Sequence, residues 1–439
     1  MAWLRFLVLA GLAAGACATT RPAVFADLAD RARSLPPEFA ADALLRIADS
    51  PNVTDVAWKR QVLEDAFHLA AGAQQAFARH DGTGRPTNRF DKSYAQGMDA
   101  CTLQSKAVDA MLTIDYKRAR EMFGEIPPPQ VPRLSCKDTL VYDVSIFYVT
   151  AGEVATRAFS AKEVAEEQPF HLLQRYTVEA TSPAQIAPIA RMLMGATLKP
   201  AQFEALVNSL AGTLTQLSGD DRSFSAFQGE AEAAITSLAT ECARRRINAQ
   251  ALVAAWDAYK TRQLSGERCT DSTKPVAQTA GRCASPQCQQ LAAQFNGLIM
   301  GPNAYGFTPE QKSTPEWAEK FRQYLAAVAD WKGDDDPDEY FQVKSQFYGD
   351  LFNLTPHGPE RDVLLRTMLA WLQENGYRRE HRVEWFYPVN TLIVHLFADP
   401  LDLKATAREL RLCADPVIAL YAQLEQLMPR PVAGMMGLL

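Results

Sequence analysis

The chain has no excess of positive charge. Its 439 residues include 45 Lys and Arg against 51 Asp and Glu, which gives a formal net charge of −6 at pH 7. Proteins that bind nucleic acid need a basic surface, because much of the binding free energy comes from neutralising phosphates. We therefore expect no nucleic-acid partner.

Several motifs that mark common enzyme classes are missing. The sequence contains no G-x-x-x-x-G-K-[ST] phosphate loop, no G-x-G-x-x-G, no H-E-x-x-H and no G-x-S-x-G. Each of these motifs acts in a defined backbone setting, usually a strand followed by a turn and a helix. Their absence argues against nucleotide hydrolysis, dinucleotide oxidoreduction, zinc proteolysis and α/β-hydrolase chemistry. We expect no bound cofactor.

Long apolar runs are also missing, apart from a short one at the N-terminus. A spanning helix needs about 20 apolar residues, and no later stretch reaches that length. Arg5 is followed by an apolar run over residues 6–14 and then by small residues over 14–18. This order is typical of a secretory signal peptide, which we place at residues 1–18. A buried N-terminal helix is the alternative.

The end of this segment contains a cysteine. Ala14-Gly15-Ala16-Cys17 resembles the bacterial lipobox, in which the cysteine is lipidated and anchors the mature chain. The lipobox prefers Leu three residues before the cysteine, where this chain has Ala14. We expect an exported protein, periplasmic or secreted. Ordinary cleavage is favoured, and a lipid anchor at Cys17 is the alternative and the one expected link to a membrane.

Seven cysteines remain after Cys17, and export places them in an oxidising compartment where disulfides form. Connectivity cannot be deduced from sequence, so we pair neighbours along the chain. The predicted pairs are Cys101 with Cys136, Cys242 with Cys269, and Cys283 with Cys288, with Cys413 left as a buried free thiol. The Cys283–Cys288 spacing has no second pair or nearby His to complete a zinc site, and we expect no metal.

Strand signals are scarce, and helical periodicity dominates the sequence. Apolar residues recur at helical spacing over 203–217, 364–372 and 417–427. A capping residue directly before proline indicates a helix start. Proline disfavours helical backbone angles in the residue before it, and proline itself is tolerated at the first helical position. We take eight pairs of this kind as helix starts: Ser50-Pro51, Ser182-Pro183, Ser285-Pro286, Thr308-Pro309, Thr314-Pro315, Asp336-Pro337, Asp399-Pro400 and Asp415-Pro416. Residues 140–149 look most strand-like, and we predict a buried helix there.

The predicted helices occur in adjacent pairs of roughly 35–40 residues, the size of helical-hairpin repeats. We predict an all-α fold, an irregular α-solenoid of helical hairpins, with a compact α/α bundle or toroid as the alternative. Residues 19–265 should form an N-terminal helical-hairpin array and residues 286–439 a C-terminal helical segment. Residues 266–285, which contain Gly and Cys, should link the two.

One region is dense in reactive side chains. Between residues 377 and 395 the sequence places Tyr377, His381, Arg382, Tyr387 and Asn390. Such groups can abstract a proton beside a sugar carboxylate and stabilise the resulting charge. The residue types resemble those of polysaccharide lyases on α/α folds, which implies a carbohydrate-active enzyme. The interpretation that we favour is a loop and helix start whose aromatic residues fill the core and whose arginines face water.

Stacked helical pairs present extended surfaces that suit proteins or peptides. Because no catalytic motif competes with this use, we predict a non-enzymatic scaffold or binding protein of the bacterial cell envelope. Its expected partner is another envelope protein or a peptide. The lyase-like enzyme is the second hypothesis.

Overall fold

The computed structural model describes residues 22–73, 78–79, 96–134, 141–219, 221–265, 285–299, 308–312, 314–333, 337–376 and 382–430. Within these ranges the chain forms 20 α-helices and one pair of two-residue strands. The predicted all-α class is confirmed.

The first half of the chain holds twelve of these α-helices together with one 3₁₀ turn. Their bounds are α1 (Ala23–Ala32), α2 (Pro37–Asp49), α3 (Val56–Ala70), α5 (Ala100–Leu112), α6 (Tyr116–Glu125), α7 (Ser145–Arg157), α8 (Ala161–Ala165), α9 (Gln168–Val178), η1 (Pro183–Gln185), α10 (Ile186–Gly195), α11 (Pro200–Gln216), α12 (Arg222–Arg244) and α13 (Gln250–Ser265).

The second half is helical as well. Its helices are α14 (Pro286–Ile299), α15 (Pro309–Lys312), α16 (Pro315–Asp330), α17 (Pro337–Leu354), α18 (Pro359–Asn375), α19 (Arg382–Ala398), α20 (Pro400–Arg411) and α21 (Pro416–Leu427). Gly376 follows α18 with a positive φ (31°), and its N–H donates to the carbonyl of Leu372. A glycine directly after the last turn is a common helix end.

An α-helix or a 3₁₀ turn begins at the proline of every predicted pair but one. Asp415, for example, accepts the N–H groups of Val417 and Ile418 at 2.9 and 3.0 Å, at the start of α21. The exception is Ser50-Pro51. Ser50 follows the last residue of α2, and α3 begins at Val56 behind the N-cap Asp55. A cap-like pair is compatible with the end of a helix too, since Ser50 has the extended backbone that precedes proline.

The two described strands correct the prediction for residues 140–149. β1 (Ala78–Arg79) pairs antiparallel with β2 (Tyr142–Asp143), and α7 begins only at Ser145. The Asp143 carboxylate accepts the N–H of Ser145 at 2.8 Å, so a side chain caps the chain as it enters the helix. The β-branched and aromatic residues before Ser145 favour an extended backbone, and a partner strand supplies its hydrogen bonds.

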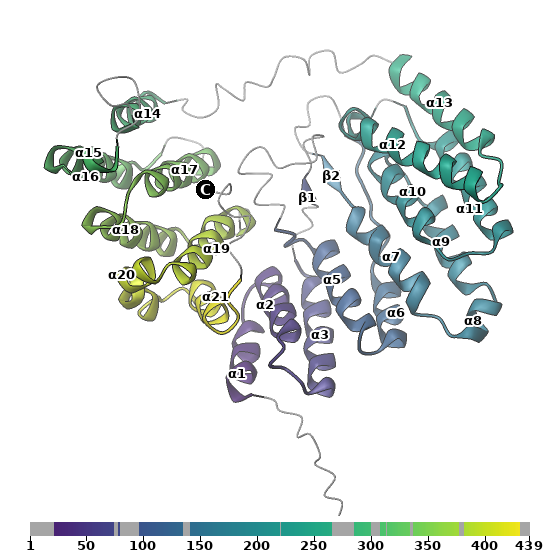
Figure 1. Cartoon of the computed structure of the whole chain (residues 1–439), viewed down its shortest axis with the longest axis horizontal. Coiled ribbons are helices and arrows are strands. Elements are labelled where there is room, and N and C mark those ends of the chain that lie inside the picture. Colours follow the sequence, from purple (N-terminus) through teal and green to yellow (C-terminus); the bar gives the residue numbers. More distant parts are fainter. Residues whose placement is uncertain are drawn as a thin grey trace, which may run out of the picture.

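The helices pack in two alternating rows. In the first half, α5, α7, α10 and α12 contact one another in succession, and α9, α11 and α13 form the other row. In the second half, α14, α16, α18 and α20 make one row and α17, α19 and α21 the other. Figure 1 shows the helices along a curved path, from α14 through α21, on through α1 to α3, and up to α13. The last helix of the second half, α21, therefore packs against the first helices of the first half, α1 and α2.

That meeting point joins α1 and α2 to α21 (Figure 1). Phe39 of α2 packs on Trp385 and Phe386 of α19, with ring centroids 6.1 and 4.9 Å away. The Tyr421 hydroxyl of α21 donates to Asp42 at 2.7 Å. The Arg46 guanidinium lies 3.0 Å from the buried Glu425 carboxylate. The four aromatic side chains at this joint belong to one continuous hydrophobic core.

The cysteines correct two predicted pairings. Cys101 and Cys242 are free, although disulfides to Cys136 and Cys269 were expected from chain proximity. Cys101 faces a small cavity, and Cys242 is buried on α12 as a small apolar side chain. Cys136, Cys269 and Cys283 lie outside the described residues. Cys288 is disulfide-bonded, and its pairing with Cys283 stays a prediction. Cys413 is a free, half-buried thiol.

The predicted signal peptide, including Cys17, lies outside the described residues, as does the predicted linker up to residue 284. Among the helices that the structure describes, none has the length and apolar content needed to cross a membrane.

Candidate functional site

The predicted reactive region falls partly outside the described residues. Tyr377 and His381 lie there, and of Arg382 the structure describes the backbone at the start of α19. Trp385 is almost fully buried, and its indole N–H donates to the carbonyl of Leu372 at 3.0 Å. Tyr387 is buried as well. These aromatic side chains are part of the core.

The polar members of this region that the structure describes do not converge. Asn390 faces the joint between the halves, where its carbonyl oxygen accepts Arg430 at 2.7 Å and its amide donates to Gln96 at 3.4 Å. His395, five residues along α19, faces α20 and lies 2.8 Å from Asp402. Tyr387, Asn390 and His395 therefore have three separate surroundings.

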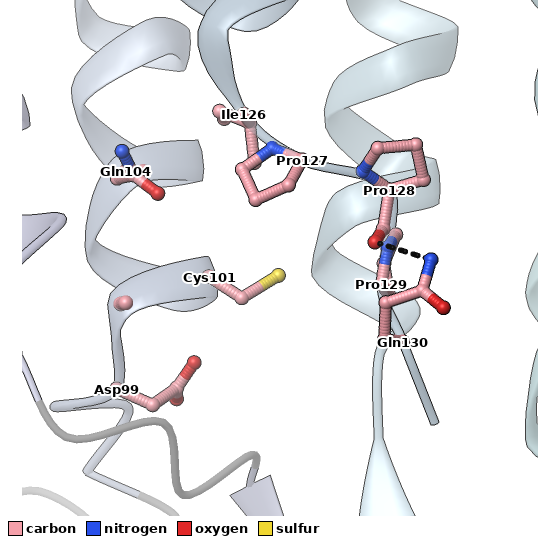
Figure 2. A pocket seen from close by; sticks show the side chains of 9 residues that line it. Asp99, Cys101, Gln104, Ile126, Pro127, Pro128, Pro129 and Gln130 are labelled. Carbon is pink, nitrogen blue, oxygen red and sulfur yellow. Dashed lines mark hydrogen bonds between the residues drawn. The ribbon is translucent and has the colours of Figure 1, made fainter. Parts of the chain in front are cut away.

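A small cavity of about 70 Å³ lies between the start of α5 and the segment after α6. Figure 2 shows the Cys101 thiol pointing towards the three consecutive prolines of that segment. The cavity is lined by Asp99, Ala100, Cys101, Gln104, Ile126, Pro127, Pro128, Pro129 and Gln130.

The side chains of Cys101 and Asp99 in this cavity have structural roles. Burial, together with the neighbouring Asp99 carboxylate, raises the pKa of the Cys101 thiol far above its usual value, so the thiolate nucleophile is suppressed. Asp99 is the N-cap of α5 and accepts the N–H of Thr102 at 2.9 Å. Burial nevertheless raises the Asp99 pKa above its usual value, since it outweighs the hydrogen bonds from Thr102.

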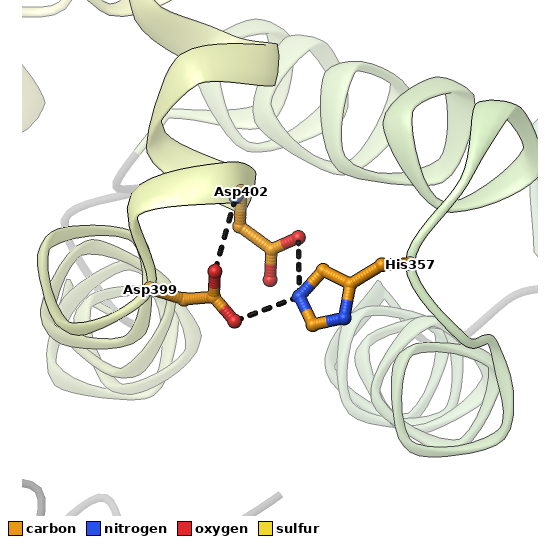
Figure 3. Close-up of side chains that lie close together, drawn as sticks. All are labelled: His357, Asp399 and Asp402. Atoms are coloured by element: carbon orange, nitrogen blue, oxygen red, sulfur yellow. Dashed lines mark hydrogen bonds and ion pairs between the residues drawn. The ribbon is translucent and has the colours of Figure 1, made fainter.

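A different cluster joins the two rows of the second half. His357 lies in the turn between α17 and α18, Asp399 is the N-cap of α20, and Asp402 is in the first turn of α20. The turn depends on Gly358, whose backbone (φ 152°, ψ −175°) is in a region that glycine alone adopts readily. This turn and the start of α20 bring the three side chains together (Figure 3).

Their donor atoms are close to one another. His357 Nε2 lies 2.8 Å from Asp399 Oδ2 and 3.7 Å from Asp402 Oδ1. One donor atom from each residue can be chosen so that all three lie within 4.8 Å of one another. The exposed fraction of the side chain is 48% for His357, 24% for Asp399 and 1% for Asp402. The cluster therefore has a buried floor and an open edge.

Arg361 and His395 hold Asp402 in place. The Arg361 guanidinium donates through Nε to Oδ1 at 2.9 Å and through Nη2 to Oδ2 at 2.8 Å, which is a bidentate pair. His395 Nε2 lies 2.8 Å from the same Oδ2. Arg361 also donates to the carbonyls of Phe352 and Thr355 at 2.9 and 2.7 Å, and so caps the end of α17.

Both carboxylates are held in the ionised form. Burial opposes ionisation of Asp402, but the hydrogen bonds from Arg361 and His395 outweigh it and lower its pKa below the usual value. For Asp399, partial burial is likewise outweighed by the contact with His357 and by the N–H groups of Asp402 and Leu401, and its pKa is also lowered. Two carboxylates stay negative around neutral pH, with one guanidinium beside them.

The sequence predicts no metal ligands, and this cluster is not apparent from it. Asp399 appears there solely as a helix cap, while His357, Arg361 and Asp402 are not singled out. The available signal is Asp399-Pro400 with a second acid at Asp402, which places two carboxylates in one helical turn. Nothing in the sequence brings a histidine from 42 residues away to that turn.

Comparison with protein-family models, with curated proteins and with solved structures found no match.

Proposed function

We propose that the chain is an exported, non-enzymatic scaffold or binding protein of the bacterial cell envelope, built as an irregular α-solenoid. The observation that carries this proposal is the succession of helix contacts in two rows, continued across the joint between α21 and α1–α2. Helices stacked in this way form extended surfaces rather than one central cavity, and such surfaces suit another protein or a peptide.

Export rests on the N-terminal sequence. Arg5, the apolar run over 6–14 and the small residues over 14–18 support cleavage before Cys17 or Thr19. The partner that we propose is accordingly an envelope protein or peptide. A lipid anchor at Cys17 would be the membrane attachment.

The carbohydrate-active alternative needs a tyrosine, a histidine and an arginine that converge in one cleft. Among the described residues, Tyr387 is buried, and Asn390 and His395 contact different neighbours. No observation on this part of the chain favours the enzyme, and the binding protein is the one function that we propose.

Cell fractionation tests export. The chain should appear in the envelope fraction in a form shortened by 16 or 18 residues, and N-terminal sequencing identifies which. Cys17→Ala distinguishes the two routes, because it abolishes lipidation and leaves ordinary cleavage unchanged. A cytoplasmic chain with intact Met1 contradicts the proposal.

Site-directed photo-crosslinking in the envelope tests binding. The crosslinker replaces exposed apolar residues on separate helices, namely Val149 of α7, Val253 of α13 and Leu401 of α20. A binding protein gives one discrete adduct from a subset of these positions, and charge substitutions beside those positions remove it. Turnover of an acidic polysaccharide that is lost in His381→Ala would instead establish the enzyme.

A further inference from the structure

We propose that His357, Asp399 and Asp402 form a binding site for one divalent transition-metal ion of the zinc class. The donors are one imidazole nitrogen and two carboxylate oxygens, contributed by the turn between α17 and α18 and by the start of α20. Because these segments are about 40 residues apart in sequence, the convergence is a property of the tertiary fold and not of one helix end.

The spacing of the donors suits such an ion. Zinc sites have metal–donor distances of about 2.0–2.2 Å, so tetrahedral geometry separates adjacent donors by roughly 3.3 Å. The distances from His357 Nε2 to the two carboxylate oxygens, 2.8 and 3.7 Å, lie on either side of that value. All three donor atoms lie within 4.8 Å of one another, so a bound ion would draw the more distant pairs together.

The oxygen atoms of Asp399 have separate roles. Oδ1 caps α20 by accepting the N–H groups of Leu401 and Asp402 at 3.0 and 3.4 Å. Oδ2 faces His357 instead. The helix cap therefore uses one oxygen and leaves the other for a ligand.

Asp402 is oriented by hydrogen bonds from neighbouring residues, as metal ligands commonly are. Arg361 and His395 hold its carboxylate in one orientation, as hydrogen-bonding partners do for metal-ligating carboxylates. Oδ1 has two lone pairs, so it can accept Arg361 Nε and bind a cation as well. The Arg361 charge offsets one of the two carboxylate charges.

The mixture of donors selects the class of metal. Calcium and magnesium prefer sites made of oxygen alone, whereas imidazole nitrogen with carboxylate oxygen suits zinc and its transition-metal neighbours. The half-exposed His357 gives solvent access, so water can complete the coordination. Three protein ligands and a water are the composition of an open zinc site.

Zinc titration of the full chain, followed by calorimetry, tests the proposal. We expect one high-affinity ion per chain. His357→Ala and Asp399→Asn should each weaken zinc binding by at least ~10-fold, because even outer-shell substitutions at metal sites cost 10–100-fold. Asn caps a helix about as well as Asp, so Asp399→Asn removes the ligand charge and keeps α20 capped.

Two control variants match these changes. Asp415→Asn alters the N-cap of α21 before its own proline, and His171→Ala removes an exposed histidine from α9. Both should bind zinc as the wild type does, and far-ultraviolet circular dichroism checks that every variant is folded. Equal affinity in wild type and Asp399→Asn, an equal loss in Asp415→Asn, or no stoichiometric binding would overturn the proposal.

Cobalt substitution separates this site from the free thiols. Co²⁺ bound to nitrogen and oxygen lacks the thiolate-to-metal charge-transfer absorption that a cysteine ligand produces. We expect visible bands without that absorption in the wild type and their loss in His357→Ala. Charge-transfer absorption that persists in His357→Ala would assign the ion to cysteines and overturn the proposal.

Discussion

Arg361 is the most constrained charged residue that the structure describes around α18. Its side chain is nearly buried, pairs with Asp402, donates to two carbonyls at the end of α17, and stacks over the Phe352 ring with the guanidinium carbon 4.0 Å from the ring centroid. A buried ion pair gives little net stability compared with apolar residues, but the loss of one partner leaves the other charge uncompensated.

Arg361→Ala should therefore lower the free energy of unfolding by about 3–5 kcal/mol, because Asp402 stays buried without its cation. Chemical denaturation of the purified chain measures this value. Arg322→Ala on α16 is the control: Arg322 is exposed and pairs with Glu319 and Glu360, so its removal should cost less than about 1 kcal/mol. Equal effects of the two substitutions would contradict the argument.

Asp109 gives a second prediction for a single residue. Burial raises the pKa of Asp109 to about 6, although Thr150 donates to the carboxylate at 3.2 Å. The folded chain then holds a proton that the unfolded chain releases near pH 4. The stabilisation is complete below pH 4 and is lost as the pH rises to about 6, a change on the order of 2–3 kcal/mol.

Denaturation at a series of pH values checks this prediction. Stability should fall between pH 4 and pH 6 more steeply in the wild type than in Asp109→Asn, which cannot titrate. Parallel curves for the two proteins would show that Asp109 titrates with its ordinary pKa.

At the scale of elements, the turn between α17 and α18 brings the cluster together. Thr355 ends α17 by donating its hydroxyl to the carbonyl of Leu351 at 2.6 Å, and Gly358 then redirects the chain into α18. The backbone of Gly358 has positive φ in a region where a side chain is strained, while no neighbouring atom occupies the space of a Cβ. Conformation alone therefore requires glycine at this position.

Gly358→Ala should lower the free energy of unfolding by about 1–3 kcal/mol, the usual cost of a residue in such a region. Gly212 provides a control of opposite sign. It lies inside α11 with open space around its Cβ position, so Gly212→Ala should stabilise the chain by roughly 0.5–1 kcal/mol. Thermal unfolding of both variants decides, and a stabilising Gly358→Ala would contradict the assignment.

At the scale of the whole molecule, the joint between α21 and α1–α2 makes the stability of each half depend on the other. Phe39 is fully buried against α19, and Phe386 in turn packs on Tyr421 with ring centroids 4.6 Å apart. Arg46 of α2 and Arg430, which follows α21, both pair with the buried Glu425. The first and last described helices therefore share one core.

Phe39→Ala should cost about 3–5 kcal/mol, the usual range for a buried Phe truncation. Because the cavity opens at the joint, amide hydrogen exchange should speed up in α21 as well as in α2. Phe170→Ala, at a half-buried residue of α9, is the control that should leave α21 unchanged. Faster exchange confined to α2 would show that the halves are independent.

Local physical chemistry determined much of this protein from sequence alone. The helical periodicity and the caps before Pro286, Pro315, Pro400 and Pro416 depend on residues within one or two turns of each other. Such interactions leave a pattern in the sequence because the atoms that interact are close along the chain.

The tertiary structure decided the contacts between residues that are distant in sequence. The joint of Phe39 with Phe386, the free thiols of Cys101 and Cys242, and the approach of His357 to Asp399 all depend on how the helices pack. Side-chain periodicity says which face of a helix is buried but not which helix covers it. Asp399 therefore reads as a cap in the sequence, and only the fold places an imidazole beside its free oxygen.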